Sequence, residues 1–106
     1  MEILHRTGEA WFAAELHRRR GELLLTGPEP QTSAAEQELH RAISIAREQS
    51  AKLFELRAVI SLARLWRDHD KRAAARDLLV PIYNWFTEGF DTPDLKDAKA
   101  LLDELA

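Results

Sequence analysis

Apolar side chains recur three or four positions apart along most of this chain, which is the spacing of one face of an α-helix. Alanine, leucine, glutamate and arginine, which favour helices, fill the segments between a few glycines and prolines. No run of alternating β-branched residues is long enough for a strand. The pattern therefore predicts an all-α fold.

Turn signals divide the chain into five predicted helices. The expected ranges are about 9–25, from 32 or 33 onward, 52–68, 72–86 and 92–105. Thr32 or Ser33 is expected to cap the second helix, and Glu36 completes a capping box with Ser33. Thr92 is expected to cap the fifth helix, and Pro93 takes its first position, where a missing amide costs little.

The aromatic stretch "NWFTEGF" precedes the fifth helix and could be a binding platform or a structural end. We expect Trp85 and Phe86 to finish the fourth helix and Phe90 to staple the turn. The apolar face of the fifth helix then covers the open end of the core. This interpretation makes the stretch part of a lid and not a site.

Length and composition predict one domain, residues 1–106, of ordinary globular character: 45% of residues are hydrophobic and 31% are charged. No apolar run approaches the roughly 20 residues of a membrane span, and no signal peptide is evident, so we expect a cytoplasmic protein without a membrane partner. The absence of cysteine excludes disulfides and thiolate sites. A net charge of -3 argues against nucleic acid as a partner.

The first two helices resemble the next two. Small residues, each followed three or four positions later by a large one, occupy matching places in the two halves: Gly21 and Leu24, Ala35 and Leu39, then Ala63 and Trp66, Ala75 and Leu79. Ala42 completes the pattern in the first half, where Ile82 stands in the second. This arrangement resembles a degenerate tetratricopeptide repeat, in which small residues let two helices cross closely.

Two stretches carry a closer resemblance: "LHRRRGELLL" and "FELRAVISLARLWRDHDKRAAARDLLVPIYNWFTEGFDTPDLKDAKALLDEL". With the segment between them, they are similar to the C-terminal repeat segment of large bacterial signalling ATPases, which often carry an adenylate or guanylate cyclase domain. The resemblance implies a right-handed superhelix of two repeats, about 9–49 and 52–87, with a capping helix at about 92–105. It implies a non-catalytic scaffold for protein–protein interaction. The phosphate-binding glycine loop and the cyclase carboxylate pair are both missing, so no enzyme activity or cofactor is implied.

The inner helices of such an array line a groove that often binds an extended peptide. The groove-facing positions are expected at Glu15, Arg18, Glu22, Arg57, Ile60, Arg64 and Arg67. Four arginines in one channel favour an acidic segment or a C-terminal carboxylate as the partner. The alternative is that these arginines solvate helix faces and pair with nearby carboxylates.

Other candidate sites are weaker or concern self-association. "RDHD" at 67–70 is the nearest approach to a metal cluster, but it lies at a helix end where solvated residues are expected, so no metal is predicted. Trp11, Phe12 and Leu16 have no preceding helix to cover them, which suggests a homodimer through the first helix. The second functional hypothesis is a regulatory sensor that binds a small anion in the arginine-lined groove.

Overall fold

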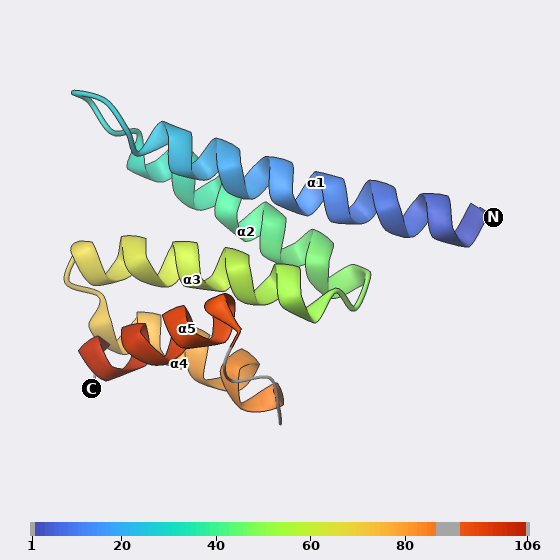
Figure 1. Cartoon of the computed structure of the whole chain (residues 1–106). Helices are drawn as coiled ribbons and strands as arrows, with labels where there is room; N and C mark the ends of the chain where they lie inside the picture. Colours follow the sequence, from blue (N-terminus) through green and yellow to red (C-terminus); the bar gives the residue numbers. More distant parts are fainter. Residues whose placement is uncertain (1, 87–91, 106) are drawn as a thin grey trace.

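The computed structural model describes residues 2–86 and 92–105, and the side chains within them from residue 12 onward. Five α-helices follow one another: α1 (Glu2–Leu24), α2 (Thr32–Glu48), α3 (Lys52–Asp68), α4 (Arg72–Trp85) and α5 (Pro93–Leu105) (Figure 1). The described residues contain no strand, so the predicted all-α class is confirmed.

Each helix runs antiparallel to the one before it, and α3 lies in the middle (Figure 1). The α1–α2 hairpin packs on one side of α3, and α4 and α5 pack on the other. Helix α3 is the only one that contacts all four others within the described part of the chain. It is therefore buried on most of its circumference, and Leu56, Val59 and Leu62 are fully enclosed.

The helix bounds agree with the sequence pattern to within one residue at α3, α4 and α5. The expected range of α1, from about residue 9, was too short, because the helix begins at Glu2. Gly8 lies inside it, and a single glycine costs only about 1 kcal/mol in a helix interior. A glycine alone therefore did not mark the start of this helix.

The predicted capping box of α2 is not formed. The N-cap residue is Gln31, which makes no side-chain capping bond. Its carbonyl accepts the Ala35 amide at 2.9 Å, so the helix starts at Thr32, and Thr32 and Ser33 already lie inside it. The cap expected at Thr32 or Ser33 therefore lies one or two residues earlier, at Gln31.

Helices α2 and α3 end in the same way, with a non-glycine residue in the left-handed region. Ser50 has φ 54° and Asp70 has φ 61°. At the end of α2 the Ala51 amide reaches back to the Ala46 carbonyl at 2.8 Å, and at the end of α3 the Lys71 amide reaches the Trp66 carbonyl at 2.8 Å. Both ends are Schellman motifs, which turn the chain tightly into the next helix.

Helices α1 and α2 cross closely at Gly21. A Cβ atom at this position would lie 2.9 Å from Leu39 Cγ and 3.2 Å from the Ala35 carbonyl oxygen. Leu39 and Ala35 are both fully buried. The small residue expected at this crossing is therefore required by the contact itself.

Helix α5 covers the end of the core, as expected. Its buried residues are Leu95, Ala98, Leu101 and Leu105. Helix α4 ends at Trp85, as expected. The interpretation of the aromatic stretch as part of a lid fails for the Trp85 side chain, which is 56% exposed and lies beside Lys52, whose Nζ is 5.5 Å from the ring centroid. Phe90 lies outside the described residues. None of the described helices is long and apolar enough to cross a membrane.

Candidate interaction surfaces

Most of the predicted groove residues meet on one face of the molecule, between α1, α3 and α5. A hollow of about 270 Å³ lies there, lined by Arg18, Glu22, Arg57, Ile60, Ser61, Arg64, Asp94 and Asp97. Five of the seven residues expected in the groove are in this set, and Glu15 and Arg67 are not. Ile60 is only 5% exposed, so it forms part of the floor and offers little surface of its own.

The arginines in this hollow are not free. Arg18 donates two hydrogen bonds to the Glu15 carboxylate, at 2.8 and 3.0 Å, and one to Glu22 at 3.1 Å. The hydrogen bond from Arg18 holds the pKa of Glu15 below its usual value, although partial burial of the carboxyl opposes the shift. The charge of Arg18 is thus compensated within α1.

The remaining arginines pair across helices. Arg57 Nε lies 3.1 Å from an Asp94 carboxylate oxygen on α5, and its Nη1 lies 4.0 Å from Glu15 on α1. Arg64 is 4.0 Å from Asp97, and the two side chains are 46% and 59% exposed. Arg64 therefore holds its carboxylate least firmly and is the arginine of this hollow most open to an outside carboxylate.

Arg67 does not line the hollow with the others. It pairs with Glu104 of α5 at 2.6 Å and with its neighbour Asp68 at 3.1 Å. The sequence also gave no sign of Asp94 and Asp97 as groove residues. Both lie on the polar face of α5, and only the docking of α5 on α3 brings them to the arginines.

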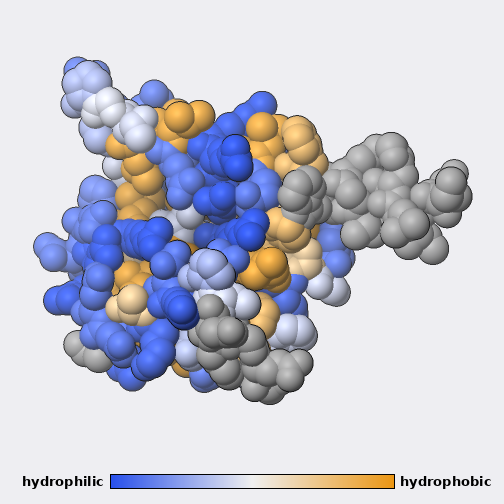
Figure 2. Space-filling model, in the orientation of Figure 1, coloured by the Kyte–Doolittle hydropathy of each residue, from blue (hydrophilic) through white to orange (hydrophobic). Residues whose placement is uncertain are grey.

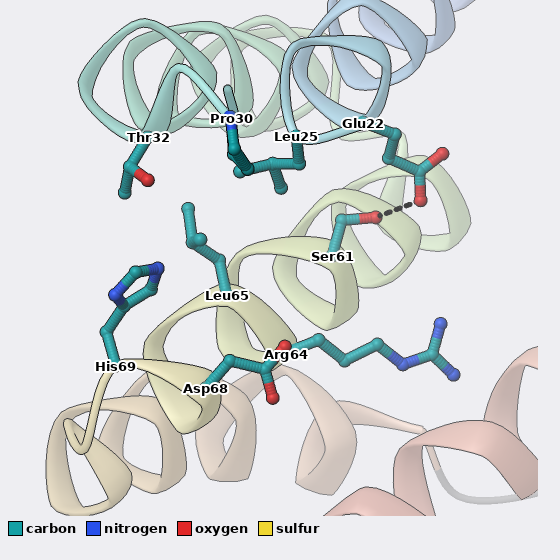
Figure 3. A pocket seen from close by; sticks show the side chains of 9 residues that line it. All are labelled: Glu22, Leu25, Pro30, Thr32, Ser61, Arg64, Leu65, Asp68 and His69. Carbon is teal, nitrogen blue, oxygen red and sulfur yellow. Dashed lines mark hydrogen bonds between the residues drawn. The ribbon is translucent and has the colours of Figure 1, made fainter. Parts of the chain in front are cut away.

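A second, larger hollow of about 570 Å³ adjoins the first along α3. Leu25, Pro30 and Leu65 form its apolar part and point toward one another between the α1–α2 loop and α3 (Figure 3). The Ser61 hydroxyl donates to Glu22 at 3.1 Å on one side of it. Arg64 lines both hollows, so they form one continuous surface.

Another exposed feature is the outward side of α1. Phe12 is 61% exposed, Leu16 37% and Leu23 69%, and the spacing places all three on one stripe of the helix. Arg19 lies in the same stripe, and its guanidinium makes no hydrogen bond or ion pair within the described residues. The side chain of Trp11, the third residue proposed for self-association, lies outside the described side chains.

The rest of the view in Figure 2 is mainly hydrophilic, with hydrophobic residues in several separate spots. Among the side chains of residues 12–86 and 92–105, no three histidines or carboxylates are grouped so that they could hold a metal ion. Comparisons of the chain with protein-family models, with curated proteins and with solved structures each found no significant match.

Proposed function

We propose that this chain is a non-catalytic protein–protein interaction module, built as a tetratricopeptide-like array and related to the tail of bacterial signalling ATPases or cyclase regulators. The observation that supports an interaction role is the continuous surface of two hollows joined at Arg64. Helix pairs arranged in this way present an extended face and not a closed pocket, which suits a segment of another protein.

The chemistry of this surface indicates what such a segment would carry. Arg64 offers a guanidinium whose present partner, Asp97, is distant at 4.0 Å and more than half exposed. Beside it, the hollow at Leu25, Pro30 and Leu65 can bury an apolar side chain. The expected partner is an extended peptide that places a carboxylate next to a leucine- or phenylalanine-sized residue.

A small anionic ligand, as in a sensor, fits this surface less well. Arg18 and Arg57 are each held at about 3 Å by carboxylates of the chain itself. A small anion would have to displace these carboxylates, and it could not use the neighbouring apolar hollow. A peptide gains apolar burial of about 25 cal/mol per Å² in addition to its charge contact.

Fluorescence anisotropy with short labelled peptides tests the proposal. Peptides that pair leucine with glutamate are expected to bind in a salt-sensitive manner, and matched peptides with lysine in place of glutamate are expected to bind more weakly. Arg64→Ala should weaken binding about fivefold, whereas Arg76→Ala, on the exposed side of α4, should not change it.

Two results would contradict the proposal. One is a set of peptides that bind equally to the wild type and to Arg64→Ala. The other is a rise in melting temperature with nucleotides or small organic acids but with no peptide, which would favour the sensor hypothesis.

A further inference from the structure

The exposed stripe of α1 has a buried counterpart in α3. Gly21 and Ala63 are the matching small residues of the two repeats, so positions correspond at an offset of forty-two. On this offset Leu16 matches Ala58, Arg20 matches Leu62 and Leu23 matches Leu65.

The three residues of α3 are 1%, 0% and 5% exposed and belong to the core that α3 forms with α2, α4 and α5. The stripe of α1 thus corresponds to the face of α3 that carries Ala58, Leu62 and Leu65, and that face of α3 is covered by other helices. In the first half, Leu23 is 69% exposed at the place where Leu65 is buried. The same geometry therefore leaves room for a further helix on α1.

The stripe of α1 differs in charge from the matching face of α3, so a helix that packs on α1 must carry different side chains. Where α3 has Ser61 and Leu62, α1 has Arg19 and Arg20. Ser61 donates its hydroxyl hydrogen bond to a carboxylate, Glu22, of the helix layer that packs on it. The equivalent position on α1 carries a guanidinium, which needs a carboxylate even more strongly once it is removed from water.

Shallow hollows on both sides of Arg19 could receive side chains of the occupant. One, of about 390 Å³, lies among Phe12, Glu15, Leu16, Arg19 and Arg57. The other, of about 480 Å³, lies among Arg18, Arg19, Glu22, Leu23 and Thr26. Phe12, Leu16 and Leu23 therefore flank Arg19, whose guanidinium has no hydrogen-bonded or ion-paired carboxylate among the described residues, although its charge acts on nearby Glu15, which is bound to Arg18.

We infer that the outward stripe of α1 is a docking surface for an amphipathic helix of another protein, with an apolar ridge against Phe12, Leu16 and Leu23 and a carboxylate opposite Arg19. This surface borders the first hollow, with which it shares Arg18, Glu22 and Arg57, but Arg64 does not line it, and the inference does not depend on peptide binding at Arg64. An acidic helix satisfies both parts of the stripe, since it buries the leucines and neutralises the guanidinium.

A second copy of this chain would bury the apolar side chains of the stripe but would not neutralise Arg19. Arg19 and Arg20 lie within about 4 Å of the middle of the Phe12–Leu23 stripe along the helix axis, at 1.5 Å per residue. A two-fold contact centred on the stripe would run the two helices antiparallel and place Arg19 of each copy opposite Leu16 of the other, so this guanidinium would lose water without gaining a carboxylate. Glu15 of the second copy would lie opposite Arg20, but it is already hydrogen-bonded to Arg18 of its own chain.

The test uses two synthetic amphipathic helices with the same leucine face, one flanked by glutamates and the other by lysines. Each labelled peptide is titrated with the full chain in low salt. We expect the glutamate peptide to bind about tenfold more tightly than the lysine peptide. In Arg19→Glu this preference should invert, while Leu23→Ser should weaken binding of both peptides.

Controls separate this surface from the rest of the molecule. Arg76→Glu on α4 and Arg64→Glu at the hollows should leave binding of both helices unchanged, and circular dichroism should show that all variants are folded. The inference is overturned if neither peptide binds below about 1 mM, if Arg19→Glu and Arg76→Glu behave alike, or if Arg64→Glu abolishes binding. A dimer in sedimentation that Leu23→Ser dissociates would assign the stripe to a second copy and would also overturn it.

Discussion

Helices α1 and α2 cross at Gly21, and whether Gly21→Ala raises or lowers the free energy of unfolding should depend on one neighbouring side chain, Leu39. In an ordinary helix interior, Gly→Ala stabilises by about 1 kcal/mol, because alanine has the higher helix propensity. At Gly21 the new methyl group would lie 2.9 and 3.0 Å from Leu39 Cγ and Cδ2. Leu39 is fully buried and cannot move away freely.

Overpacking of this kind costs about 1–3 kcal/mol. After the gain in propensity is subtracted, Gly21→Ala should lower the free energy of unfolding by about 1 kcal/mol. In a Leu39→Ala background the obstructing atoms are gone, and the remaining neighbour is the Ala35 carbonyl oxygen at 3.2 Å. There Gly21→Ala should raise the free energy of unfolding by about 0.5–1 kcal/mol, although Leu39→Ala itself costs about 2–5 kcal/mol.

Urea unfolding followed by far-ultraviolet circular dichroism measures all four proteins of this double-mutant cycle. The expected coupling between the two positions is about 2 kcal/mol. In the wild-type background, the loss of about 1 kcal/mol in the free energy of unfolding on Gly21→Ala corresponds to a fall in melting temperature of about 4 °C. If Gly21→Ala stabilises the protein equally in both backgrounds, the two helices do not approach as closely as described.

Further predictions concern charge pairs and the terminal helix. Acidification should lower the free energy of unfolding: the pKa of Glu15 lies below its ordinary value of 4.5 in the folded chain, so its contribution is present above that value and is lost as pH falls through the folded pKa. Glu15→Gln should remove this component. In urea unfolding, the difference in the free energy of unfolding between the wild type and Glu15→Gln should therefore become smaller as the pH is lowered from 7 to 3. Arg47→Met should cost about 1 kcal/mol, because Arg47 Nε lies 2.9 Å from the Glu55 carboxylate, which is buried; Arg41→Met on the same helix should change the same measurement by less than about 0.5 kcal/mol. Leu101→Ala should cost about 2–5 kcal/mol and lower the melting temperature, while an unchanged melting temperature would mean that α5 does not complete the core.

Much of the fold could be predicted because its causes are local. The bounds of α3 follow from closely spaced apolar residues that end at a short polar turn, and the start of α5 follows from Pro93. The start of α2 at Thr32 was within the predicted choice, but its cap was not. A cap depends on which carbonyl accepts the first helical bond, and several polar residues in a row offer equivalent choices.

Most members of the candidate surface were predicted, and so was the alternative that its arginines pair with nearby carboxylates, but the carboxylates of α5 were not. Sequence spacing shows pairs three or four residues apart, such as Arg18 with Glu15. It cannot show that Asp94 reaches Arg57, because that contact depends on how α5 docks against α3. Ile60 was expected to face outward since helical periodicity leaves one side free, but α3 is covered by four helices.

The central place of α3 has a consequence for how the chain folds. Within the described residues, every packed pair of helices is adjacent in the chain or separated by a single helix. Contacts of this kind close short loops, and proteins dominated by them fold in microseconds to milliseconds. The α1–α2 hairpin packs its apolar face on α3, and so do α4 and α5 from the other side. We therefore expect α3 and α4 to form the folding nucleus. The two ends of the chain would then condense on it in the same kinetic step.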